Sequence, residues 1–285
     1  MNSRKIFVLG LGCQKGGTTW LHNYLDRHPQ TSMGFRKEYH VLDAINLPSC
    51  ASFRSESVAR AKRRLRGWMP LGQSAKNDIR HALLYSDVAE YYGYFSSLVD
   101  FEGIHLTGDI TPSYAGLSPD VLRDVRAELI NRGFDVRVVF LMRDPVKRCV
   151  SAMRMHRRKF AVTDPDENRT LRDLYASPDF EMRTRYDLTM QSMEAAFPQD
   201  EIMHLFYEEL FSRNAIESVC RFLGLKFIEP DFDKKINVDQ SKFKLSSELL
   251  DQVAEHYAPV YRSVIDSFGL ERVGALWPRA RAIGS

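Results

Sequence analysis

The sequence predicts an α/β fold, a P-loop-like three-layer arrangement in which helices flank a central, mainly parallel sheet. Short apolar runs rich in β-branched residues alternate along the chain with longer helical segments, as in a parallel sheet covered on both faces. A glycine-rich turn follows the first apolar run and leads into a helix. The length of 285 residues and the hydrophobic content of 44% suit a single domain, residues 1–285, with a helical C-terminal part over 207–285.

The first strand, turn and helix occupy residues 5–27. Lys5 to Leu11 is apolar, residues 12–17 are polar with three glycines, and a helix from Thr18 to Arg27 is ended by Pro29. In such a turn the free backbone N–H groups and the positive end of the helix dipole converge on one point. Glycine lets the main chain come close to an anion there. The turn is therefore a candidate phosphate site.

The lysine of this turn stands at an unusual position. A Walker A loop ends in Gly-Lys-Ser/Thr, whereas here Thr18 follows Gly17 and the lysine comes earlier, at Lys15. No second motif for holding Mg²⁺ is evident, so no metal is expected. Three alternatives remain at this point: a P-loop NTPase or small-molecule kinase, a non-catalytic nucleotide-binding protein, and a turn without a ligand.

The remaining elements continue the alternation of strands and helices. Further strands are expected at residues 32–34, 105–110, 137–142 and 201–206, of which 137–142 is the most apolar and is expected to be central. Further helices are expected at residues 87–100, 118–131, 146–159, 180–197, 214–223 and 246–268. Residues 46–80 are irregular and basic and are expected to form an insertion over the active-site face, while 160–178 form a polar connection.

A second anion site is expected where the central strand ends. That strand delivers Arg143 to the carboxyl edge of the sheet, where open α/β sheets bind their ligands. Pro145 starts the following helix, and Ser151 lies eight residues after Arg143, roughly two turns into that helix. The arginine fork and the serine hydroxyl are suited to sharing one phosphate group.

Both stretches resemble cofactor motifs of one enzyme family. Lys15-Gly-Gly-Thr-Thr-Trp-Leu resembles the 5′-phosphosulfate loop, and Arg143 with Ser151 the 3′-phosphate motif, of sulfotransferases that use 3′-phosphoadenosine 5′-phosphosulfate (PAPS). The resemblance implies in-line transfer of a sulfuryl group to an acceptor hydroxyl, less readily to an amine, with adenosine 3′,5′-bisphosphate as product. Lys15 would neutralise the departing phosphate. The residues that would hold the phosphate and sulfuryl oxygens are Gly16, Gly17, Thr18 and Thr19.

A base for the acceptor hydroxyl is expected after the first helix. Lys37-Glu38-Tyr39-His40 resembles the Lys-Glu-x-His segment of heparan-type glycan sulfotransferases, which implies that Glu38 is the base and that His40 assists or replaces it. Lys37 is then a candidate acceptor contact. The alternatives are a surface carboxylate for Glu38 and a packed or exposed ring for His40.

A further segment, Asp109-Ile-Thr-Pro-Ser-Tyr, resembles Lys-Thr-Pro-x-Tyr in the same enzymes. Ile110 stands where those enzymes have lysine, so a glycosaminoglycan acceptor does not follow from the resemblance. Asp109 and Ser113 are candidate acceptor contacts. Asp109 is equally suited to capping the next turn.

Positively charged residues also lie outside these motifs. In a C-terminal loop, Lys242, Phe243 and Lys244 lie where the family closes a loop over the adenine and the 3′-phosphate, and they are candidate cofactor contacts. Basic residues also gather at 54–66 and 154–159. Those clusters suit solvated helix faces and the helix dipole, or alternatively an acidic acceptor.

Composition bounds the remaining possibilities. The net charge of +3 does not require a nucleic-acid partner, and no apolar run approaches the ~20 residues that cross a bilayer. The four cysteines lack the spacing of a zinc site or a disulfide framework. We therefore expect a cytoplasmic enzyme with no transmembrane segment and no nucleic-acid partner. The acceptor, a hydroxyl-bearing carbohydrate, small molecule or lipid, and the oligomeric state are left open.

Overall fold

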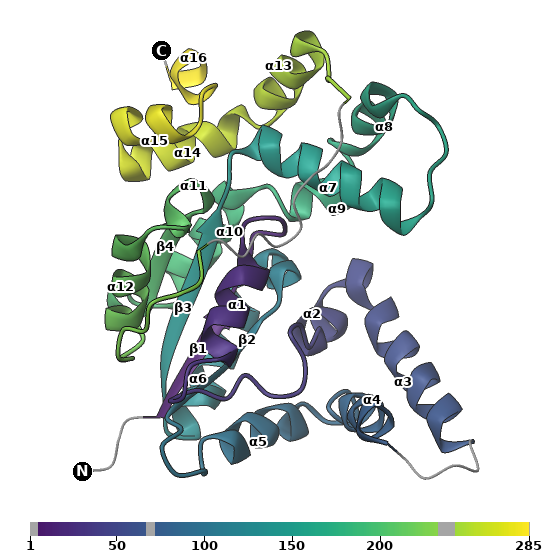
Figure 1. Ribbon diagram of the computed structural model, residues 1–285, viewed down its shortest axis with the longest axis vertical. Coiled ribbons are helices and arrows are strands. Elements are labelled where there is room, and N and C mark those ends of the chain that lie inside the picture. The colour runs from purple at the N-terminus through teal and green to yellow at the C-terminus, as the bar shows by residue number, and fades with distance from the viewer. Residues whose placement is uncertain (1–4, 67–71, 233–242, 285) are drawn as a thin grey trace.

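A four-stranded parallel sheet forms the centre of the fold in the computed structural model, which describes residues 5–66, 72–232 and 243–284 (Figure 1). The strands are β1 (Lys5–Gly10), β2 (Leu106–Ile110), β3 (Phe134–Met142) and β4 (Ile202–Phe206). Their order is β2-β1-β3-β4, and every neighbouring pair is parallel. The predicted α/β fold is confirmed.

Helices cover both faces of the sheet and make three layers (Figure 1). The helices are α1 (Thr18–Asp26), α2 (Val41–Asn46), α3 (Ser52–Leu65), α4 (Gln73–Leu83), α5 (Val88–Leu98), α6 (Pro119–Asn131), α7 (Pro145–Lys159), α8 (Glu167–Leu174), α9 (Pro178–Met182), α10 (Tyr186–Ala196), α11 (Tyr207–Leu210), α12 (Arg213–Phe222), α13 (Ser247–His256), α14 (Ala258–Phe268), α15 (Leu270–Leu276) and α16 (Ala280–Gly284). Short 3₁₀ turns lie at Pro48–Cys50, Pro112–Gly116 and Gln199–Glu201. None of the described helices combines the length and the apolar character needed to span a membrane.

Alternate strand residues serve two separate cores. Phe7 and Leu9 of β1 point into the larger core with α5, α6, α10 and α14. Ile6 and Val8 point into the smaller core, which α1 and α12 cover. This period of two is the geometry of a strand that is buried on both faces, and it explains why β1 and β3 read as nearly continuous apolar runs.

Five expected elements differ in the structure. The strand expected at 32–34 is only an isolated bridge between Thr31 and Leu106. Residues 46–80, expected to be irregular, contain most of an α3–α4 hairpin, and the expected polar connection 160–178 contains α8. The helix expected at 180–197 is α9 and α10, separated at residues 183–185. The helix expected at 246–268 divides at Tyr257, because Pro259 begins a new helix and has no N–H to continue the old one.

The register of the sheet brings the chemistry to one edge. Gly10 pairs with Ile110 on one side and with Val139 on the other, so the loops after β1, β2 and β3 leave the sheet in the same direction. Parallel sheets bind ligands at this carboxyl edge.

Candidate active site

A cleft of about 1510 Å³ opens at the carboxyl edge of the sheet. It brings together residues that are far apart in the sequence, from the β1–α1 loop, the segment before α2 and the start of α7. The predicted residues that line it are Lys15, Gly17, Thr18, Thr19, Lys37, Glu38, His40, Ser113, Arg143 and Ser151. Gly16 lies in the same loop, with its N–H donated to the Cys13 carbonyl at 3.0 Å.

The β1–α1 loop presents an uncapped helix start. Gly17 precedes α1 with a φ of 96°, which favours glycine, and α1 has no acidic residue in its first turn. No side chain caps this helix within the described residues, so its first N–H groups are available to an anion. Burial lowers the pKa of Lys15, and the nearby charges of Arg158, Arg143 and Lys37 lower it further. An anion bound here would relieve that repulsion.

Arg143 connects the two predicted anion sites. Its Nη1 donates to the Lys15 carbonyl at 3.0 Å, and its guanidinium lies 4.3 Å from the centre of the Tyr207 ring. Its buried Nε has no hydrogen-bond partner within the described residues. A buried N–H group without a partner is costly, and a phosphate oxygen would satisfy it.

The fully buried Arg148 holds this region together, and the sequence analysis missed it. It donates to the Gln14 side chain at 3.3 Å and to Thr184 Oγ1 at 2.6 Å. It thereby ties the β1–α1 loop to the break between α9 and α10. The feature of the sequence that could have identified Arg148 is its position one turn after Asp144, on the inward face of α7.

The segment before α2 carries a network of charged groups. Lys37 pairs with Glu38, and His40 lies between two carboxylates: Nε2 is 3.4 Å from Glu38 Oε2 and Nδ1 is 2.7 Å from Asp43 Oδ2. Burial alone would lower the pKa of His40, but Asp43 and Glu38 outweigh it and raise the pKa to about 9. Burial alone would raise the pKa of Glu38, but His40 and Lys37 lower it to about 2. At neutral pH the cleft therefore contains a carboxylate beside an imidazolium.

The α3–α4 hairpin supports this segment. Phe53 of α3 stacks on the His40 ring at 3.7 Å between centroids, with the rings 12° apart. The Tyr39 carbonyl is bonded by His81 Nε2 at 2.7 Å and by the Tyr85 hydroxyl at 3.0 Å. The hairpin thus fixes the backbone between Glu38 and His40.

Asp109 does not line the cleft, contrary to the expectation that it contacts the acceptor. It is fully buried and accepts hydrogen bonds from Tyr91 at 3.0 Å, Tyr114 at 2.6 Å and Thr111 at 2.6 Å. Burial raises its pKa to about 6, although these hydrogen bonds oppose the rise. Thr111 also accepts the Tyr39 N–H at 3.1 Å. Asp109 therefore supports the loop after β2. This role is closer to the alternative expectation, that it caps the next turn, than to contact with the acceptor.

Other candidates are also placed differently from expectation. Ser113 lines the cleft, but its hydroxyl is donated to the buried Asp43, a residue that the sequence analysis did not select. Phe243 and Lys244 are exposed and are not part of the cleft lining, and Lys242 lies outside the described residues. Tyr207, which the sequence analysis did not select, lines the cleft beside Arg143.

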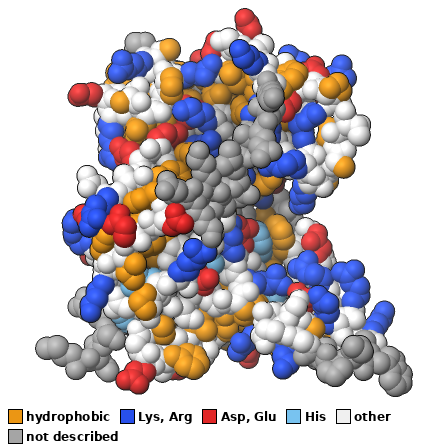
Figure 2. All heavy atoms as spheres, viewed as in Figure 1, with side chains coloured by type: hydrophobic (Ala, Val, Ile, Leu, Met, Phe, Trp, Pro, Cys, Tyr) orange, Lys and Arg blue, Asp and Glu red, His pale blue; other side chains and the backbone are white. Residues whose placement is uncertain are grey.

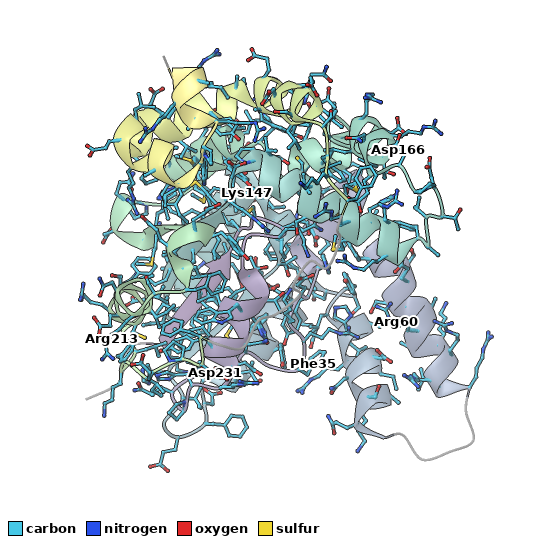
Figure 3. The ribbon with its side chains drawn as sticks, turned by 45° about the horizontal axis from the view of Figure 1, so that its top comes forward. Phe35, Arg60, Lys147, Asp166, Arg213 and Asp231 are labelled. Atoms are coloured by element: carbon cyan, nitrogen blue, oxygen red, sulfur yellow. The ribbon has the colours of Figure 1, made fainter. Side chains whose placement is uncertain are left out.

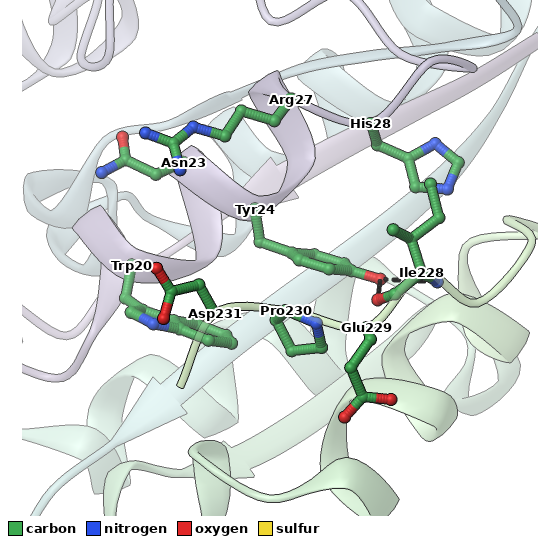
Figure 4. Close-up of a pocket in the computed structure, with 9 residues that line it drawn as sticks. All are labelled: Trp20, Asn23, Tyr24, Arg27, His28, Ile228, Glu229, Pro230 and Asp231. Atoms are coloured by element: carbon green, nitrogen blue, oxygen red, sulfur yellow. Dashed lines mark hydrogen bonds between the residues drawn. The ribbon is translucent and has the colours of Figure 1, made fainter. Parts of the chain in front are cut away.

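An aromatic pair that was not anticipated borders the cleft. Trp20, directly after Thr19, lies parallel to Phe232 with 6.0 Å between ring centroids and 11° between planes. Trp20 also borders a smaller cavity of about 250 Å³ between α1 and residues 228–231 (Figure 4). The position of Trp20 as the third residue of α1, three residues after Gly17 of the predicted phosphate turn, was the signal that could have identified it.

Comparison with known proteins identifies the family. A model of the sulfotransferase family matches residues 6–229. The chain belongs to the sulfotransferase family. Among curated proteins no sequence match is found.

Solved sulfotransferases share the fold of this sulfotransferase. A sulfotransferase from Alicyclobacillus acidocaldarius superposes with a TM-score of 0.61 at 16% identity, covering 93% of this chain and 96% of the other. The sulfotransferase domain from the curacin biosynthetic pathway superposes with a TM-score of 0.50 at 16% identity, covering 90% of this chain and 99% of the other. At this identity the likeness supports the fold alone.

In this sulfotransferase the Arg143 side chain therefore joins the two predicted anion sites, and the Glu38 carboxylate lies on another segment that lines the same cleft. No cluster of three or more potential metal ligands occurs in the part of the chain that the structure describes. The cleft therefore combines cations, the uncapped N–H groups of α1 and a carboxylate, which are groups that could neutralise charge, bind an anion and accept a proton.

Proposed function

We propose that this sulfotransferase uses PAPS as donor and an acceptor hydroxyl as substrate. The observation that carries the proposal is the hydrogen bond from Arg143 Nη1 to the Lys15 carbonyl, which joins two anion sites at one sheet edge. The unpartnered Nε of Arg143, within the described residues, fits a ligand with a second phosphate. An ATP-like ligand would leave that group unsatisfied.

The residues of this chain divide the cofactor between them. Lys15 and the N–H groups at the start of α1 hold the 5′-phosphosulfate, while Arg143 and Ser151 hold the 3′-phosphate. Trp20 and Phe232 supply flat apolar surfaces for the adenine. When bound, PAPS supplies an activated sulfuryl group. The bond between sulfur and the 5′-phosphate oxygen would break as a bond to the acceptor oxygen forms, with adenosine 3′,5′-bisphosphate as the leaving group.

Glu38 accepts the proton that the acceptor hydroxyl releases. His40, protonated at neutral pH, holds Glu38 through Nε2 and is itself held by Asp43 through Nδ1. A carboxylate with a pKa near 2 is a weak base. It is sufficient if the proton leaves after the oxygen has begun to bond to sulfur, because that bond acidifies the hydroxyl. His40 then acts as a positioning residue and not as the base.

A binding experiment tests the cofactor assignment. Calorimetry on the full chain should find adenosine 3′,5′-bisphosphate bound at least about tenfold more tightly than adenosine 5′-monophosphate, because only the former satisfies Arg143. Arg143→Gln should abolish the preference, whereas Arg221→Gln, at an exposed position outside the cleft, should keep it. Equal affinity for the two nucleotides in the unmodified protein, or Mg²⁺-dependent turnover of ATP, would favour the kinase alternative.

A transfer experiment tests the activity. Labelled PAPS is offered with sugars, phenols, amines and lipid extracts, and a labelled hydroxyl product is expected. A product formed only from amines would contradict the hydroxyl assignment.

The cellular location is proposed from the thiols. All four cysteines are buried and free, which is the state that the reducing cytoplasm maintains. Recovery of the protein in an extracytoplasmic fraction would contradict this.

A further inference from the structure

The cleft contains far more positive than negative charge. Its lining includes nine lysines and arginines but one carboxylate, Glu38. Figure 2 shows basic side chains over the α3–α4 hairpin at the lower right, with others above them over α7 and α8. Four of the nine have carboxylate partners: Lys37 with Glu38, Arg154 with Glu167, Arg183 with Asp179, and Arg279 with Asp251. Those that have no carboxylate partner within the described residues are Lys15, Arg143, Lys147, Arg158 and Lys159.

Helix α7 carries four of these nine cations, Lys147, Arg154, Arg158 and Lys159. Lys147, Ser151, Arg154 and Arg158 recur every three or four residues, so they lie along a single side of the helix. All four line the cleft. Lys147 points toward the middle of the molecule, whereas Arg60 of α3 lies far out on the hairpin (Figure 3). Arg158 lies seven residues, roughly 10 Å of helix, beyond the proposed 3′-phosphate contact Ser151.

The C-terminal part of α7 has two kinds of cation. Arg154 is held by Glu167 at 2.8 Å, and Arg157 turns away from the cleft to Thr170 Oγ1 at 2.6 Å. Arg158 and Lys159 are exposed, face the cleft, and meet no carboxylate in the described part of the chain. A cation in the last turn can stabilise the helix dipole without facing the cleft, as Arg157 does. The dipole therefore does not explain why Arg158 and Lys159 face the cleft.

Arg158 also lies close to the transfer end of the proposed cofactor site. Its charge is the largest electrostatic contribution, after burial, to the lowered pKa of Lys15. On the facing side of the cleft are Lys37 and the Phe53 ring. Arg158 and Lys37 both repel Lys15, and a second anion bound beside them would reduce that repulsion further than the cofactor alone.

We propose that the acceptor of this sulfotransferase is itself anionic, and that Arg158 and Lys159, the cationic end of α7, bind its carboxylate, sulfate or phosphate group. This inference rests on the proposed function and deepens it, because it names the chemical class of the acceptor. The acid group binds at the end of α7 and the reacting hydroxyl faces Glu38. The cofactor phosphates remain with Lys15, Arg143 and Ser151.

The test uses two acceptor probes that differ only at C6 of the sugar. 4-Nitrophenyl β-glucuronide has a carboxylate at this position and 4-nitrophenyl β-glucoside has a hydroxymethyl group. Binding of each to the full chain saturated with adenosine 3′,5′-bisphosphate is measured by calorimetry. The glucuronide should bind about tenfold more tightly than the glucoside, and raising the salt concentration should reduce the difference. The double variant Arg158→Gln/Lys159→Gln should bind both probes equally, with the affinity that the unmodified protein has for the glucoside.

A matched control removes the same charge elsewhere. Arg221→Gln/Lys226→Gln replaces one exposed arginine and one exposed lysine outside the cleft and should keep the tenfold preference. The inference is overturned if the unmodified protein does not prefer the glucuronide, or if both double variants lose the preference equally. It is also overturned if Arg158→Gln/Lys159→Gln weakens the nucleotide instead, because these cations would then belong to the cofactor. Failure of the nucleotide to bind to the unmodified protein would instead refute the proposed function.

Discussion

The two walls of the cleft are built in different ways. The wall with Lys15 and Arg143 consists of short loops that leave neighbouring strands, and backbone bonds such as Leu141 N–H to the Gly12 carbonyl at 3.1 Å continue the sheet into it. The wall with Glu38 and His40 does not directly follow a strand within the described residues. Side chains hold it instead: the Phe53 ring, the bonds from His81 and from Tyr85 just after α4 to the Tyr39 carbonyl, and Thr111, which accepts the Tyr39 N–H.

This difference separates two properties of the enzyme. A substitution in the sheet-borne wall should change cofactor affinity and turnover together, because the same groups are proposed to bind the phosphates and to stabilise the departing one. A substitution in the helix-supported wall should change turnover while cofactor affinity stays constant. The predictions below test that separation.

The largest effect is expected from Glu38→Gln. The amide keeps the size of the side chain but cannot accept the proton, so kcat should fall by about 10²–10⁴-fold. The affinity for adenosine 3′,5′-bisphosphate, measured by calorimetry, should stay within about twofold of that of the unmodified protein. Glu56→Gln, at an exposed carboxylate of α3, is the matched control and should be silent. A comparable loss of nucleotide affinity in Glu38→Gln would place Glu38 in the cofactor site.

Lys15→Asn should reduce both properties. Asparagine tolerates the φ of 70° at this position, so the variant removes the ammonium group with little backbone strain. We expect kcat to fall by about 10²–10³-fold and nucleotide affinity by about tenfold, because charge on the departing phosphate is no longer neutralised. Unchanged nucleotide affinity would show that Lys15 acts only on the sulfuryl group. Lys226→Asn, at an exposed lysine outside the cleft, provides the comparison.

The same difference explains what the sequence could predict. Arg143 follows an apolar strand directly and Lys15 lies in the short loop after another, so local pattern and the geometry of parallel sheets were enough to predict that they lie at one edge. Ser151 followed from helical periodicity. The α/β fold followed from the alternation of strands and helices.

The helix-supported wall was predicted less well because its contacts are not local. Asp43 lies three residues after His40, but its role depends on the αL backbone of His40, with φ of 54°, and on Ser113 from a distant loop. Asp109 ends a strand as a ligand-binding residue would, yet Tyr91 of α5 and Tyr114 cover it. No pattern within either segment indicates that these helices pack there.

A smaller effect on stability is expected from His40→Asn, and it should depend on pH. The folded pKa of about 9 lies above the ordinary value near 6.5. His40 therefore stabilises the fold fully below about pH 6.5, and this contribution is lost as the pH rises through about 9. The difference in unfolding free energy between the two proteins should shrink by about 1–3 kcal/mol between pH 6 and pH 9.5, measured by urea denaturation. Asparagine suits the αL backbone, so a constant difference across this range would contradict the ion pairs with Glu38 and Asp43.

The smallest effect is expected from Tyr85→Phe. It removes one of the two hydrogen bonds to the Tyr39 carbonyl, while the bond from His81 at 2.7 Å remains. We expect a loss of about 0.5–1.5 kcal/mol in unfolding free energy. Because this carbonyl lies between Glu38 and His40, kcat should also fall, by a few-fold, while nucleotide affinity stays unchanged. Tyr92→Phe is the control, since the Tyr92 hydroxyl makes no hydrogen bond within the described residues and its ring is equally buried. If Tyr85→Phe lowers stability but leaves kcat intact, the α3–α4 hairpin stabilises the fold without positioning the base.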